Sequence, residues 1–119
     1  MPDDQGLDTL LALNGETFRF EGGFSVRIQA WQVEPAPDIP HGVRYNLTLH
    51  DRYGTRLAGF DNAHGVKVRT KAAGKRMPFD HRHRSRTDKG VPYVYRDAAQ
   101  LLEDFFEEVE QIMRRLRQT

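Results

Sequence analysis

The chain has 119 residues, a length that suits one domain over residues 1–119, because a hydrophobic core divides only in considerably longer chains. It contains no cysteine, which excludes a disulfide scaffold, a thiolate zinc site and a cysteine nucleophile. The formal net charge is +1, 29% of the residues are charged and no apolar run is long enough for a transmembrane helix. The N-terminal Met1-Pro2-Asp3-Asp4 is acidic where a signal peptide is basic. We therefore expect a soluble, cytoplasmic protein with no membrane contact.

The first half of the chain predicts two β-hairpins, preceded at residues 7–13 by a short helix or an irregular apolar lead-in. Apolar and polar residues alternate in the expected strands, as they do when one face of a sheet is buried. The expected strands are Thr17–Phe20, Phe24–Trp31, Val43–His50 and Thr55–Phe60. The turns expected inside the hairpins are at Gly22-Gly23 and Asp51–Gly54. A proline-containing loop at residues 34–40 separates the hairpins, and Asp61-Asn62 is expected to begin another loop.

The charge is concentrated in the middle of the chain. Residues 67–89 contain nine lysines and arginines and two aspartates, a formal charge of +7, so the other 96 residues carry −6. Val66 and Val68 suggest a brief strand, and the residues after them are too polar for a core. We expect a basic loop at about residues 70–90, long enough to be mobile until a partner binds it. The net charge of +1 therefore does not exclude a polyanionic partner such as RNA.

The C-terminal residues predict a long amphipathic helix at about 97–117. Asp97 is an N-cap candidate with Gln100 three residues later, as in a capping box. The apolar residues that follow with helical spacing are Leu101, Leu102, Phe105, Phe106, Val109, Ile112, Met113 and Leu116. Val91–Tyr95, before this helix, has the composition of a last short strand. The sequence therefore predicts an α+β fold, in which an antiparallel sheet of four to five strands packs against a long C-terminal amphipathic helix.

Histidines and arginines alternate in the basic segment, and this pattern suits acid–base chemistry on a phosphate. On an extended segment His81 and His83 face one side, about 6.5 Å apart at Cα, and Arg82 and Arg84 face the other. Imidazole gives and takes protons near neutral pH. Cleavage of RNA by its own 2′-hydroxyl needs a base, an acid and positive charge beside the phosphate. The segment supplies these parts without a metal or another cofactor.

Simpler interpretations fit the same residues. A segment rich in arginine, lysine and histidine is commonly a solvated or merely anion-attracting surface. The His-x-His spacing also suits a metal, with Asp61, His64 or Asp80 as a third ligand, and would then indicate a metal-dependent hydrolase. Tyrosines such as Tyr45 and Tyr93 stack on bases in some proteins but are more commonly core rings.

Four phrases of the sequence together resemble the TumE-type toxins of bacterial type II toxin–antitoxin systems, over about residues 10–116. The phrases are Pro40–Asp51, Gly59–His64, Asp80–His83 and Tyr93–Phe106. The matching polar positions are Asp61, Asn62, His64, Asp80, His81 and His83. The resemblance implies a cytoplasmic bacterial toxin encoded beside a DNA-binding antitoxin, which neutralises it by direct contact.

The leading hypothesis is a type II toxin that cleaves RNA without a metal. His81 and His83 would be the acid and the base, with His64, oriented by Asp61, as the alternative to one of them. The residues expected to hold phosphates are Arg82, Arg84, Arg76 and Lys75. The residues expected to contact a base are Tyr45 and Tyr93.

A second hypothesis, from a different class, is a non-catalytic binding module. In it the basic loop binds nucleic acid or an acidic protein partner. This hypothesis predicts binding that weakens with salt and produces no cleavage product. The sequence leaves the RNA target open, and also whether the chain forms a homo-oligomer.

Overall fold

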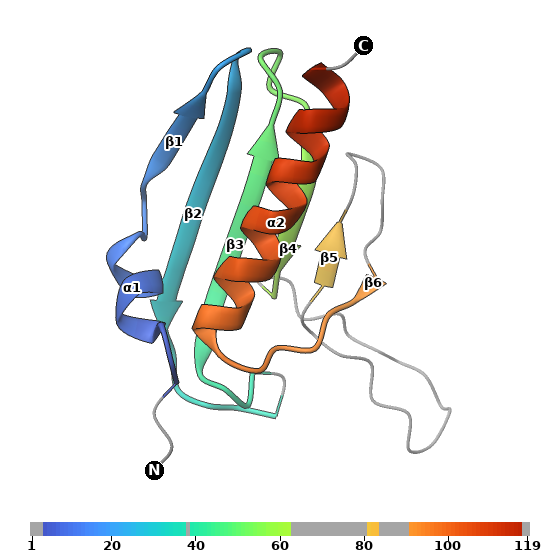
Figure 1. Ribbon diagram of the computed structural model, residues 1–119. Helices are drawn as coiled ribbons and strands as arrows, with labels where there is room; N and C mark the ends of the chain where they lie inside the picture. Colours follow the sequence, from blue (N-terminus) through green and yellow to red (C-terminus); the bar gives the residue numbers. More distant parts are fainter. Residues whose placement is uncertain (1–3, 38, 63–80, 84–90, 118–119) are drawn as a thin grey trace.

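In the part of the chain that the structure describes, six antiparallel strands follow one another in the sheet in the same order as in the sequence, with one long helix across them (Figure 1). The computed structural model describes residues 4–37, 39–62, 81–83 and 91–117. The elements are α1 (Leu7–Ala12), β1 (Thr17–Phe20), β2 (Phe24–Gln32), β3 (Val43–His50), β4 (Arg56–Asp61), β5 (His81–His83), β6 (Val91–Pro92) and α2 (Ala98–Arg117). No helix in these ranges is both long and apolar enough to cross a bilayer.

The core lies between the sheet and α2. The apolar positions of the strand alternation all point toward this helix, as the buried pattern of β2 and β3 shows. Phe60 of β4 meets Phe105 of α2 edge to face, with ring centroids 5.7 Å apart, and both side chains are fully buried. The helix thus buries the stripe that its sequence spacing predicts, and one face of the sheet provides the surface for it.

The N-terminal segment is attached to the start of α2. Asp97 caps the helix through a bond from the Gln100 N–H to its Oδ1 (2.7 Å), and Asp4 accepts a second bond, from the Ala98 N–H. Gly6 (φ +80°) lies so close to Ala99 that a Cβ on it would be 2.7 Å from the Ala99 backbone. Gln100 does not complete the expected capping box, because its side chain donates to Asp104 instead. Contacts far apart in the sequence therefore support the first turn of the helix.

The structure confirms the α+β prediction and refines its details. The apolar lead-in is helical (α1), and the described residues form six strands of the sheet where four to five were expected. Within the expected loop, His81–His83 forms a short strand, β5, that pairs with β4. The rest of the proposed loop at residues 70–90, and the brief strand at Val66 and Val68, lie outside the described residues.

The prediction that Asp61 begins a loop is wrong, because Asp61 is the last residue of β4. The physical reason is its neighbour Asn62, which is fully buried. The Asn62 side chain accepts the Tyr45 N–H through Oδ1 (2.8 Å) and donates from Nδ2 to the Val43 carbonyl (2.7 Å). These bonds continue the pairing with β3 past the last residue of β4 and fix the end of the strand.

Candidate polar site on the open sheet face

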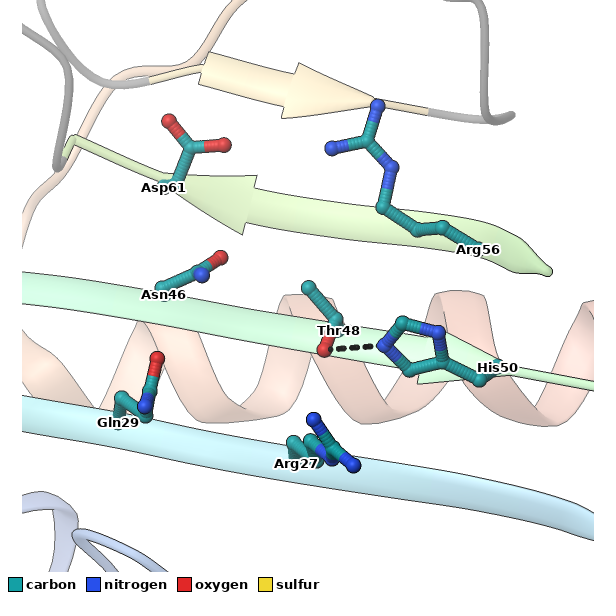
Figure 2. A pocket seen from close by; sticks show the side chains of 7 residues that line it. All are labelled: Arg27, Gln29, Asn46, Thr48, His50, Arg56 and Asp61. Atoms are coloured by element: carbon teal, nitrogen blue, oxygen red, sulfur yellow. Dashed lines mark hydrogen bonds between the residues drawn. The ribbon is translucent and has the colours of Figure 1, made fainter. Parts of the chain in front are cut away.

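The polar residues of the strands meet on the sheet face opposite α2, which we call the open face. Directly paired residues of neighbouring strands have side chains on the same face of a sheet. One row across four strands consists of Arg27, Thr48, Gly59 and His83. A second row consists of Gln29, Asn46 and Asp61, and the His81 backbone pairs with Asp61 at its end. No helix in the described part of the chain covers this face (Figure 2).

A histidine–carboxylate pair joins β4 and β5 on the open face. His83 Nε2 lies 2.9 Å from Asp61 Oδ2, and the two side chains are only 12% and 11% exposed. At this low exposure, water screens the contact between them less than it would on the surface. The carboxylate fixes the orientation of the imidazole ring, as the partner of an acid–base histidine does.

Gly59 leaves the floor of the site, the sheet surface between Thr48 and His83, free of a side chain. Gly59 sits between Thr48 and His83 in the first row, so no side chain separates these two residues. A Cβ on Gly59 would meet Thr48 Cγ2 and Arg56 Cδ at 3.5 Å, an ordinary contact distance. The backbone therefore tolerates a side chain there, and the glycine leaves space where a larger residue would fill it.

An irregularity between β3 and β4 adds an arginine to the open face. The register changes between Leu49 and His50, so that Ala58 faces Leu49 but Arg56 faces His50. Leu57 is the extra residue and packs against the core. Such a bulge redirects side chains, and without it Leu57 would take the position of Arg56.

These residues line a pocket of about 300 Å³, close to the lower end of the range for small-molecule sites, roughly 300–1,000 Å³. Its lining residues are Arg27, Gln29, Asn46, Thr48, His50, Arg56 and Asp61 (Figure 2). His50 Nε2 lies 2.9 Å from Thr48 Oγ1, a hydrogen bond whose direction depends on the tautomer. The pocket thus contains two arginines, a histidine, a hydroxyl, two amides and the carboxylate that orients His83.

The structure brings some of the sequence-predicted residues together and separates others. Asp61, which the sequence analysis expected to orient His64, contacts His83 instead. Arg82 pairs with Phe60 and so belongs to the helix-covered face, where its buried Nε has no hydrogen-bond partner within the described ranges. His83 and Arg82 point to opposite faces, as the alternation predicted, and Arg82 does not share the face of the histidine–carboxylate pair.

The two tyrosines considered for base contacts lie on the helix side of the sheet. Tyr45 is fully buried and stacks with Tyr95 at a centroid distance of 5.9 Å. The Tyr93 hydroxyl donates to Asp104 of α2 (2.6 Å), and its ring packs edge-on against Phe60. Alternation along β3 places Tyr45 beside Leu47 in the core, so we include neither tyrosine in the proposed site.

Several predicted residues lie outside the described ranges. They are His64, Lys75, Arg76, Asp80 and Arg84. Within the described ranges, no three histidine, aspartate or glutamate side chains gather closely enough to hold a metal ion.

Sequence reasoning missed most residues of the pocket, although their pattern was visible. Gln29, Asn46 and Thr48 are polar members of the strand alternation, and a shared register would have placed them on one face. Arg56 could not have been found in this way, because regular pairing would have put Leu57 opposite His50.

Fold and site together define a small α+β protein with a histidine–carboxylate pair on an open, arginine-bearing sheet face. A family model described as toxin TumE matches residues 9–113, which is most of the chain. The chain therefore belongs to the TumE toxin family, and the resemblance is confirmed. This membership makes it a toxin-family protein of a toxin–antitoxin system and implies an antitoxin partner. No curated protein and no solved structure matched the chain.

Proposed function

We propose that this protein is the toxin of a type II toxin–antitoxin system and cleaves RNA on its open face without a metal. The observation that carries the proposal is the 2.9 Å contact between His83 Nε2 and Asp61 Oδ2 at 11–12% exposure. A nearly buried carboxylate–imidazole pair beside a polar pocket is an arrangement found where histidines transfer protons.

The chemistry uses the 2′-hydroxyl of the RNA as the nucleophile. A base removes its proton, the oxygen attacks phosphorus, and the bond to the 5′-oxygen of the next nucleotide breaks as an acid protonates that oxygen. The products are a 2′,3′-cyclic phosphate and a free 5′-hydroxyl. His83 acts as the base through Nδ1, because the carboxylate holds Nε2. His81, paired with Asp61 in the strand register, is the proposed acid.

The charge of the open face supports an RNA substrate. Strand register places four arginines there: Arg19, Arg27, Arg44 and Arg56. Among the described strand residues on this face, Asp61 is the one acid, and it is in contact with His83. Such a face attracts phosphates and accelerates the association of a polyanion.

The proposal is tested by inducing the toxin without its antitoxin and measuring growth and RNA integrity. His83→Ala and Asp61→Asn should both abolish growth arrest and RNA cleavage. Glu107→Gln, which changes an exposed carboxyl group on α2, is the matched control and should leave both intact. Full toxicity and cleavage in the His83→Ala variant would refute the proposal.

His50 gives a second arm to the same test. It lines the pocket and is an alternative to His81 as the acid. Loss of cleavage in His81→Ala with activity retained in His50→Ala supports the assignment. The reverse pattern moves the acid to His50.

The open face also fits a non-catalytic module that binds nucleic acid, which is the second candidate function. Its arginines would then hold RNA or an acidic protein without turnover. RNA affinity that falls with salt, together with intact RNA on a gel after long incubation, would favour this candidate.

The proposed toxin acts in the cytoplasm, where its RNA substrate is found. Its antitoxin would be a DNA-binding protein that covers the toxin by direct contact. A helix-turn-helix protein encoded beside the gene, and co-purifying with the toxin in stoichiometric amounts, supports this partner. The mass of the purified toxin alone tests whether it forms a homo-oligomer.

A further inference from the structure

The pocket on the open face has two chemically different ends (Figure 2). Asp61, Asn46 and Gln29 follow one another across three strands at one end. Arg56 and Arg27 stand at the other end, on either side of Thr48 and His50. A ligand that fills the pocket should therefore be anionic at one end and a neutral hydrogen-bonding group at the other.

The amide end offers donors and acceptors that no described residue uses. Asn46 and Gln29 are direct partners in the register of β2 and β3. Neither side-chain amide has a hydrogen bond with another described residue, although Asn46 is half-buried. Each amide presents one acceptor and two donors, so the pair matches the edge of a nucleobase, where donors and acceptors stand side by side.

An exposed aromatic ring lies next to the amides. Trp31 is 42% exposed and stands two residues after Gln29 on β2, hence on the same face. Regular strand geometry puts their Cα atoms about 6.5 Å apart. Tryptophan on a polar face is a stacking platform for bases of single-stranded nucleic acids.

The cationic end is suited to a phosphate. Arg27 lies two residues before Gln29 on β2, and Arg56 reaches the pocket from β4 because of the bulge. Arginine holds phosphate oxygens through its planar, forked donors. The separation between the arginines and the amides, about two residues of strand, is comparable to the separation between the phosphate and the base of one nucleotide.

We propose that this pocket is a nucleotide subsite that reads one base of the RNA. The base stacks on Trp31 and pairs with the amides of Gln29 and Asn46, while its phosphate lies between Arg27 and Arg56. Amide side chains pair best with adenine, so the subsite selects adenine. This inference rests on the proposed function and deepens it, because it names the base recognised beside the cleaved bond.

The single tryptophan of the chain makes the test direct. The purified toxin is titrated with the 5′-monophosphates of adenosine, guanosine, cytidine and uridine, and with ribose 5-phosphate, while Trp31 fluorescence is followed. Adenosine monophosphate should quench the fluorescence most strongly and at the lowest concentration. Ribose 5-phosphate should compete with it without quenching.

Variants separate the two ends of the pocket. Asn46→Ala and Gln29→Ala should each weaken the binding of adenosine monophosphate roughly five- to a hundredfold, the range for one lost base contact. Neither change should alter the affinity for ribose 5-phosphate. Arg56→Ala should weaken the binding of both ligands. Gln32→Ala removes an exposed amide at the end of the same strand and should change neither.

The outcomes distinguish this inference from the function on which it rests. Equal affinity for all four nucleotides, unchanged in Asn46→Ala, would overturn the base-reading subsite even if RNA cleavage depends on His83. Adenine-selective quenching without any RNA cleavage would instead overturn the proposed ribonuclease and keep the subsite. Mapped cleavage sites give the third readout: enrichment of adenine at one position, lost in Asn46→Ala, is expected.

Discussion

Asp61 and Asn62 are neighbours in the sequence with separate tasks. The Asp61 side chain lies on the open face and contacts His83, whereas the Asn62 side chain is buried and bonds the β3 backbone on both sides of Arg44, at the Val43 carbonyl and the Tyr45 N–H. Both residues belong to the phrase that resembles the toxin family. One serves the proposed chemistry and the other fixes the strand that carries it.

Replacement of Asn62 by alanine should destabilise the fold. The change leaves the Tyr45 N–H and the Val43 carbonyl buried without their partners, a cost of about 2–4 kcal/mol for two unsatisfied groups. Urea denaturation followed by circular dichroism measures the free energy of unfolding. Asn46→Ala, an asparagine on the open face, is the matched control and should change it by less than about 0.5 kcal/mol. Equal stability of the two variants would contradict the positioning role of Asn62.

Replacement of Gly59 by valine should block the site without removing any polar group. A β-branched residue suits a strand, and the first added carbon finds ordinary contacts at 3.5 Å. The larger side chain fills the space between Thr48 and His83, so RNA cleavage should fall by at least roughly tenfold while the melting temperature does not decrease. An active Gly59→Val variant would show that the substrate does not enter over this floor.

At the scale of elements, α2 depends on residues at the opposite end of the sequence. Asp4 accepts bonds from the Ala98 N–H and from the Tyr95 hydroxyl, and the Gln5 carbonyl accepts the Ala99 N–H. The helix therefore begins in a cap built by two distant segments. Tyr95, before the helix, connects the N-terminal segment to the sheet, because its hydroxyl donates to Asp4 and its ring stacks on Tyr45 of β3.

Asp4→Ala should destabilise the protein by about 1–2 kcal/mol, since it removes a helix cap and the partner of a tyrosine hydroxyl. Asp8, an exposed acid in α1, is the control, and Asp8→Ala should have an effect below about 0.5 kcal/mol. Thermal denaturation of the two variants at the same pH compares them directly. If Asp4→Ala has the same melting temperature as the native protein, the hydrogen bonds of Asp4 do not stabilise α2.

Elements with a strong repeating pattern were predictable, and the exceptions have physical causes. The alternation of β2 and β3 and the helical spacing of α2 follow from the burial of one face, and the structure contains all three. β5 was missed because a three-residue strand has no detectable period. The bulge at Leu57 and the bonds of Asp4 depend on partners distant in the sequence, which a pattern read along one chain does not contain. His83 and Asp61 were both candidates from the sequence, but their contact was not foreseen, because Asp61 was expected to orient His64.

Although the net charge of the chain is only +1, the charged residues of the described part are unevenly distributed over its surface. The described strands present arginines on the open face, and the exposed side of α2 presents glutamates, among them Glu103, Glu107 and Glu110. The open face and residues 98–110 of α2 thus carry opposite charge, and the arginines of α2 are confined to its last turn. We expect the described part of the open face to attract a polyanion.

The salt dependence of RNA affinity should report which arginines contact phosphates. Each phosphate neutralised on a single strand contributes about 0.7 to the slope of log affinity against log salt concentration. The double variant Arg27→Ala/Arg56→Ala should lower this slope by about 1.4, since it removes two contacts. Arg114→Ala, at the exposed end of α2, should leave it unchanged. An unchanged slope in the double variant would place the RNA elsewhere. A cleavage-inactive background such as His83→Ala keeps the RNA intact during the titration.

His83, held by Asp61, is proposed to cleave RNA through the 2′-hydroxyl. The most direct measurement is the chemistry of the ends formed when the purified toxin cuts a defined RNA in the presence of EDTA. We expect 2′,3′-cyclic phosphate and 5′-hydroxyl ends, formed by the native protein and by Glu107→Gln but lost in His83→Ala and Asp61→Asn. Products with 5′-phosphate ends, or cyclic phosphate ends formed equally by His83→Ala, would contradict it.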